Sequence, residues 1–127
     1  MLYGGRIQEH ARQPRNVGSL ENPDIRHEEV NPLCGDRIRI EAKLDDHHRI
    51  AEIRFRGDAC MICQAAGSIL TEMVNGWPIE TIEALKPADL LNALEAPIRP
   101  ARVKCALLPL EILQSGVASY RHLHPVS

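Results

Sequence analysis

The stretch RIRIEAKL, residues 37–44, alternates charged and apolar side chains one for one. A period of two is typical of a β-strand that turns one face to the core and the other to water. After a polar turn, residues 50–56 resume the alternation, with Ala51, Ile53 and Phe55 on one face. The two runs therefore predict an antiparallel hairpin.

On both sides of the hairpin the pattern changes. A weaker alternation predicts an edge strand at residues 25–30, whereas apolar residues at helical spacing beyond Cys60 predict one buried helix face. The expected helices cover residues 2–12, 62–74 and 101–120, with one or two short helices at 79–85 and 87–94; Pro109 must kink the last helix or lie in its first turn. We expect an α+β fold, a three-stranded antiparallel sheet covered by helices, in a single compact domain spanning residues 1–127.

The composition narrows the classes of function. The 15 basic and 17 acidic residues give a net charge of -2, which leaves no overall electrostatic footprint for nucleic acid or an anionic membrane. One Trp, one Phe and two Tyr are too few for a base-stacking platform. No apolar run approaches the ~18 residues of a membrane span, and the N-terminus lacks the apolar core of a signal peptide. We expect a cytoplasmic protein that binds neither nucleic acid nor a membrane.

The four cysteines are expected to be thiols rather than disulfides, because the cytosol keeps thiols reduced. A chain of 127 residues can bury a core without disulfides or metal. Any bound metal is therefore expected to serve function rather than folding.

Three cysteines and one acid occupy junctions between the expected elements. Cys34 and Asp36 lie on the turn NPLCGD, residues 31–36, immediately before a strand; Cys60 separates a strand from a helix, and Cys105 lies at a helix start. Helix N-termini stabilise thiolates through their free N–H groups. Three soft thiolates with one hard carboxylate suit tetrahedral zinc or an iron–sulfur cluster.

Three motifs carry a resemblance to a known family. They are PRNVG at 14–18, preceded by Tyr3 and His10, then NPLCGDRI at 31–38, and FRGDAC at 55–60 leading into a helix rich in small residues. With these motifs the chain resembles the IscU/SufU/NifU N-terminal family of iron–sulfur cluster assembly scaffolds over nearly its whole length. The segment PARVKCA at 100–106 looks like the SufU branch, because Lys104 stands where IscU proteins carry a His.

The resemblance implies a function and a ligand set. Cys34, Cys60 and Cys105 would accept sulfur and, with Asp36, would bind zinc, iron or a transient 2Fe–2S cluster, Asp36 keeping that cluster labile. The implied partners are a cysteine desulfurase and iron–sulfur acceptor proteins, and a homodimer around a shared cluster stays open. The chain would act as a scaffold and sulfur acceptor rather than as a free-standing enzyme.

Alternatives remain open at this point. The chain could be a zinc-dependent sulfur acceptor that builds no cluster, a thiol-redox protein working through Cys60 and Cys63, or a protein with purely structural zinc. Cys63 is additional to the family pattern, and packing is its simpler role. Lys104 could lower the pKa of Cys105 or pair with Asp36 in the metal-free state, and His10, His47 and His48 are interpreted as packing, surface or turn residues.

Overall fold

The computed structural model describes residues 4–124, and its elements follow the order expected from the sequence. The elements are α1 Gly5–Arg12, β1 Ile25–Val30, β2 Arg37–Leu44, β3 Ile50–Arg56, α2 Met61–Val74, α3 Ile79–Glu83, α4 Pro87–Ala93, the 3-10 turn η1 Pro100–Arg102 and α5 Val103–Leu123. The predicted α+β class is confirmed. Leu2 and Tyr3, which the sequence places in the first helix, lie outside the described residues.

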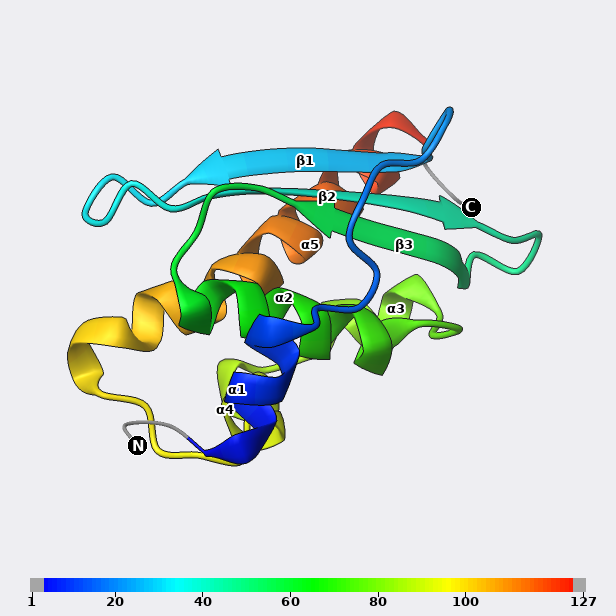
Figure 1. Cartoon of the computed structure of the whole chain (residues 1–127). Helices are drawn as coiled ribbons and strands as arrows, with labels where there is room; N and C mark the ends of the chain where they lie inside the picture. The colour runs from blue at the N-terminus through cyan, green and yellow to red at the C-terminus, as the bar shows by residue number, and fades with distance from the viewer. Residues whose placement is uncertain (1–3, 125–127) are drawn as a thin grey trace.

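The sheet is antiparallel throughout, with strand order β1-β2-β3. The β2 residues Ile38, Ile40 and Ala42 are fully buried, while Arg37 stays exposed, as the alternation predicts. The helices cover this apolar face and leave the other face of the sheet without a helix (Figure 1). The core therefore lies between one sheet and one helical layer.

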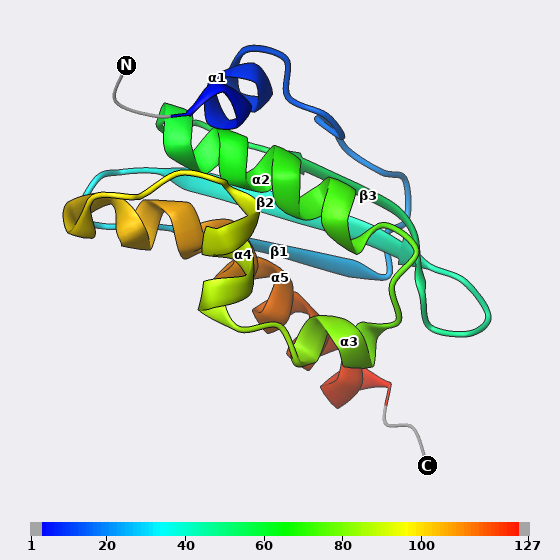
Figure 2. The same cartoon turned by 90° about the horizontal axis from the view of Figure 1, so that it is seen from below.

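Two long helices form most of that layer (Figure 2). α2 packs against β3, and α5 packs against β1 and β2. Gly67 of α2 faces the ring of Phe55, where an added Cβ would lie 2.9 Å from Phe55 Cδ2. The small residue lets helix and sheet come close together.

One detail of the predicted hairpin is wrong. Ala51 is exposed and Ile50 takes the buried position, because the register between β2 and β3 shifts between Lys43 and Leu44. A bulge of this kind moves the side chains before it to the opposite face.

The interior proline of α5 removes one hydrogen bond from the first part of the helix. Pro109 lies inside the helix beyond its first turn, and it is buried. Proline has no N–H, so the carbonyl of Cys105, four residues earlier, receives no α-helical hydrogen bond from it. The turn of helix that carries Cys105 is therefore less tightly held than the rest of α5.

Three connections distant in sequence meet at one end of the molecule. The β1–β2 loop, the β3–α2 connection and the start of α5 lie together at the left in both views (Figures 1 and 2). Cys34 and Asp36 lie in the β1–β2 loop, Cys60 lies in the β3–α2 connection, and Cys105 is the third residue of α5. Within the described residues, no helix is long and apolar enough to cross a membrane.

Candidate metal and sulfur centre

The turn at 31–36 is organised by Asn31. Its carbonyl accepts the backbone N–H groups of Cys34 (3.3 Å) and Gly35 (2.7 Å), and its own N–H donates to the carbonyl of Asp36 (2.7 Å). Its side-chain Oδ1 accepts the N–H of Leu33 at 3.0 Å. Gly35 adopts φ 76°, a left-handed conformation that glycine tolerates without strain. The turn thus exposes Cys34 and directs the buried Asp36 inward.

The β3–α2 connection is fixed to the same turn by backbone contacts. Arg37 N–H donates to the carbonyl of Asp58 at 2.8 Å, and Cys60 N–H donates to Asp36 Oδ1 at 3.0 Å. Gly57 lies against β2, where an added Cβ would fall 1.9 Å from the Arg37 carbonyl oxygen. The two strand ends are therefore held together by main chain, with no side chain between them.

Three of the four predicted donors come together. The ligand atoms of Cys34, Asp36 and Cys105 all lie within 4.8 Å of one another, and Cys34 Sγ is 3.4 Å from Cys105 Sγ, with one thiol donating to the other. Cys34 is exposed, whereas Cys105 and Asp36 are buried. This arrangement gives one open side and two enclosed donors. Cys60 is outside the group of three but is joined to Asp36 through its backbone N–H.

The electrostatics of the group favour a cation. Burial, the contact with Cys34 and the neighbouring negative groups raise the pKa of Cys105 to about 12. Burial also raises the pKa of Cys60, and the Asp36 carboxylate adds to this, while the amides of Cys63 and Ile62 at the helix start oppose it. A bound cation would reverse the cost of ionising these sulfurs.

Asp36 itself has one unused oxygen. Its Oδ1 accepts the Cys60 N–H, but Oδ2 is buried and has no hydrogen-bond partner among the residues the structure describes. An unsatisfied buried polar atom costs roughly 1–3 kcal/mol, and more when it is charged. A metal ion on Oδ2 would remove that cost, so the residues present fit a thiophilic metal with one oxygen ligand.

Cys63 is buried directly behind the group. It is fully enclosed, and burial followed by the charge of Asp36 raises its pKa well above the usual range for a thiol. Cys34, Cys60 and Cys105 contribute to the same shift. Cys63 is therefore part of the packed core, and the three other cysteines are near enough to shift its pKa.

Lys104 and His48, which the sequence also singled out, do not belong to the group of donors. Lys104 is exposed, and no ion pair within 4 Å joins it to Asp36, both residues being described by the structure. His48 lies in the hairpin turn with its ring edge-on to Tyr120. The residue that sequence reasoning missed is Asn31, although the Asn-Pro pair that opens the turn was a usable signal.

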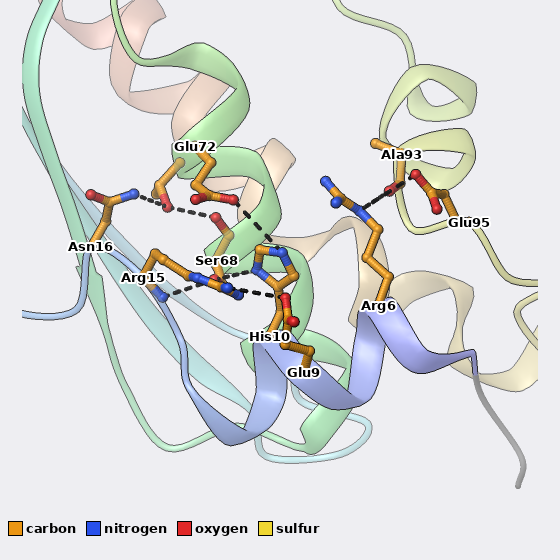
Figure 3. Close-up of polar contacts among 10 residues, drawn as sticks. Arg6, Glu9, His10, Arg15, Asn16, Ser68, Glu72, Ala93 and Glu95 are labelled. Atoms are coloured by element: carbon orange, nitrogen blue, oxygen red, sulfur yellow. Dashed lines mark hydrogen bonds and ion pairs between the residues drawn. The ribbon is translucent and has the colours of Figure 1, made fainter.

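A second polar cluster fastens α1 to α2 (Figure 3). His10 Nδ1 lies 2.7 Å from Ser68 Oγ, which also accepts the Arg15 backbone N–H at 2.9 Å, and His10 Nε2 lies 3.7 Å from Glu72 Oε1. The trio of Ser68, His10 and Glu72 has the residue types of a hydrolase. Ser68 is fully buried and His10 is 2% exposed, so no substrate reaches them, and His10 is a packing residue as predicted.

Comparison with known proteins gives one family and closely matching curated relatives. The family model described as NifU-like N terminal domain matches residues 2–125. The chain is 32% identical over 127 residues to the "Iron-sulfur cluster assembly scaffold protein IscU" of Escherichia coli (strain K12), covering 95% of each chain. It is 30% identical to the protein of the same name from Azotobacter vinelandii, covering 96% of each.

Solved structures share the fold. A putative scaffold protein for the SUF system from Fervidobacterium islandicum matches with a TM-score of 0.75 and 24% identity, covering 92% of this chain and 97% of that one. A NifU-like N-terminal protein from Brucella abortus matches with a TM-score of 0.77 and 20% identity, covering 95% of each. The sheet and its helical layer are thus an architecture found in both.

Proposed function

The chain belongs to the NifU-like N-terminal domain family, and from that membership we infer that it is an iron–sulfur cluster assembly scaffold. The observation that carries the inference is the meeting of Cys34, Asp36 and Cys105 within 4.8 Å, in a chain that matches scaffold proteins over 95% of its length. The cluster is cargo, so the site must both hold metal and give it up.

We assign the donors as follows. Cys34 and Cys105 supply two sulfur ligands, Asp36 supplies an oxygen through Oδ2, and Cys60 borders them as a fourth donor. A carboxylate binds soft metal less tightly than a thiolate, which favours release. The exposed position of Cys34 leaves the site accessible to a partner.

The sulfur would come from a cysteine desulfurase, as a persulfide whose terminal sulfur is attacked by a thiolate of the scaffold. Cys34 is the most accessible of the four thiols, and Cys60 is partly exposed. Acceptor proteins would approach from the same open side.

Anaerobic reconstitution tests the scaffold function. Ferrous iron and inorganic sulfide should produce a thiolate-to-iron absorption band in the wild type, and Cys34→Ala and Cys105→Ala should each abolish it, because two sulfurs of the group are then reduced to one. The matched control is Asp58→Asn, which neutralises an exposed acid beside the site whose contact with Arg37 uses only the main chain. An unchanged band in the cysteine variants would overturn the assignment.

A second candidate is a zinc-bound sulfur acceptor that builds no cluster. The donor set favours this candidate, because two sulfurs and one oxygen within 4.8 Å of one another suit a single tetrahedral ion. Elemental analysis of the purified protein separates the two candidates. Stoichiometric zinc that resists exchange for iron would favour the acceptor, and exchange followed by cluster formation would favour the scaffold.

A further inference from the structure

The structure divides the four thiols into two pairs. Cys34 and Cys105 stand with Asp36 in the metal-sized group, whereas Cys60 and Cys63 stand together at the start of α2. Cys60 is the N-cap residue of α2, and Cys63 is the third residue of the helix. The side chain of an N-cap residue lies over the third helical residue, which is why these two positions form capping boxes. The two residues therefore lie next to each other across the first turn of α2.

The second pair also differs in access. Cys60 is partly exposed, while Cys63 is fully buried beneath it. A sulfur donor that reaches the site meets Cys60 before Cys63. Cys63 is thus placed to react with what Cys60 carries and shielded from reagents in solution.

Cluster assembly from a persulfide requires a reduction, because the terminal sulfur of a persulfide must gain two electrons to become sulfide. We propose that Cys63 supplies this step, acting as a resolving thiol that releases sulfide from a persulfide on Cys60. The proposal rests on the inferred scaffold function, and it adds to it a reductive activity that belongs to the CxxC sequence of this chain.

The step balances without an outside reductant. The sulfur of Cys63 attacks Cys60 Sγ, a bond forms between these two sulfurs, and the bond from Cys60 Sγ to the terminal sulfur breaks. The terminal sulfur leaves with the bonding electron pair and takes the thiol proton of Cys63, so the products are one Cys60–Cys63 disulfide and one H₂S. An external dithiol then reduces the disulfide and resets the pair.

The pairing consumes only one of the four proposed donors, Cys60, and leaves the group of three intact. If Cys34 or Cys105 resolved the persulfide, the disulfide would consume a second donor at the moment when sulfide is released. Resolution by Cys63 keeps Cys34, Asp36 and Cys105 available, and the sulfide is produced beside them. This separation is what the extra cysteine adds to a three-cysteine site.

Sulfide release from metal-free protein tests the proposal. Reduced protein is treated with inorganic polysulfide, desalted anaerobically, and followed for sulfide without added thiol. The wild type should release sulfide at least about tenfold faster than Cys63→Ala, because the resolving thiol acts intramolecularly. Met61→Leu is the matched control, since it alters an exposed side chain between the two cysteines without touching a thiol, and it should behave as the wild type.

Peptide mapping identifies the disulfide that forms. Complete tryptic cleavage leaves Cys60 and Cys63 as the two cysteines of the peptide 57–102, because trypsin does not cut before Pro87 or Pro100. Cys34 and Cys105 fall in separate peptides, 27–37 and 105–121. After release and alkylation, the wild-type peptide 57–102 should be two hydrogens lighter than its dithiol form and unalkylated. This readout needs no variant and is unaffected if Cys63→Ala folds poorly.

Three results would each overturn the proposal. They are equal rates of sulfide release from the wild type and Cys63→Ala, a disulfide joining peptides 27–37 and 105–121, and a persulfide retained on Cys63. The scaffold function is tested separately, by cluster formation in the wild type from ferrous iron and inorganic sulfide. A wild type that forms the cluster but shows no Cys60–Cys63 disulfide would refute the resolving role alone.

Discussion

Asp36 uses its two carboxylate oxygens for different purposes. Oδ1 holds the N-terminal end of α2 through the Cys60 N–H, and the buried Oδ2 has no hydrogen-bond partner among residues 4–124. The residue is thus a structural acceptor and a candidate metal ligand at once. Its charge also opposes ionisation of Cys60 and Cys105, which helps to raise the pKa of both thiols in the metal-free site.

Asp36→Asn separates the two purposes. The amide oxygen can still accept the Cys60 N–H, but the negative charge is lost. We expect the affinity for Zn²⁺ to fall about tenfold or more, and the pKa of Cys60 and of Cys105 to fall as well, because a like charge is removed. Competition with a chromophoric chelator measures the affinity. Asp58→Asn should retain wild-type affinity, and an equal loss in both variants would count against Asp36 as a ligand.

His10 makes the stability of the fold depend on pH. Burial, assisted by the charge of Arg15, lowers its pKa in the folded state below the ~6.5 of an unfolded histidine, and Glu72 only partly opposes this. Between the two pKa values the unfolded chain binds more protons. The contribution of the buried, neutral His10 to the free energy of unfolding is therefore complete above about pH 6.5. It is lost as the pH falls from there through the lowered pKa of the folded state.

Urea unfolding at a series of pH values measures this contribution. His10→Asn should flatten the decline in the free energy of unfolding between about pH 7 and pH 5, because the titrating group is gone. His122→Asn, at an exposed position of α5, should leave the decline unchanged. The same slope in the wild type and His10→Asn would contradict the assignment.

At the scale of the elements, the junction of β2, β3 and α2 positions the site. The Arg37–Asp58 backbone hydrogen bond and the close passage of Gly57 over the Arg37 carbonyl align the end of β3 with the start of β2. This alignment sets the distance between Cys60 and Asp36. The geometry of the site therefore depends on the main-chain contact between Arg37 and Asp58.

Gly57→Ala should disrupt that contact. Its φ of 157° lies in a region that L-residues avoid, and the added Cβ would fall 1.9 Å from a backbone oxygen. We expect a loss of about 2 kcal/mol or more in the free energy of unfolding and weaker metal binding. Gly5→Ala, at the open start of α1, has no atom within 4 Å and should be neutral or slightly stabilising. Similar melting temperatures for the two variants would contradict this account.

At the scale of the whole molecule, the largest buried side chains of the core lie outside the candidate ligand set. The apolar core runs through β2, α2 and α5 and includes fully buried residues such as Ile40, Ile69 and Leu113. None of these residues contributes a candidate ligand. The metal-sized group lies at one end of this core rather than inside it.

Metal removal should therefore lower stability without unfolding the chain. We expect chelated protein to keep its far-ultraviolet circular dichroism and a cooperative melt, and zinc at a hundred times its dissociation constant to add about 2.7 kcal/mol. Cys34→Ala should retain the fold, because Cys34 is exposed and outside the core. The variant should lose the stabilisation by zinc, because Cys34 is a proposed ligand. Loss of structure on chelation would instead favour structural zinc.

The sequence predicted the elements well because their patterns are local. The alternation in β2 and the apolar stripe of α2 each depend on neighbours within one element. The burial of Ile50 in place of Ala51 was missed, because it arises from a bulge set by the pairing of two strands. For the site, the residue types and their junctions were predictable, but the closeness of Cys34 to Cys105 and the unpaired oxygen of Asp36 follow from tertiary packing.

Three of the four proposed donors, Cys34, Asp36 and Cys60, lie on short segments that link strands and helices. We expect cargo to load and unload mainly by movement of these segments, which occurs in nanoseconds to microseconds. Neither the sheet nor the helical layer has to part. Turnover at this end of the molecule can thus be fast while the remainder keeps its shape.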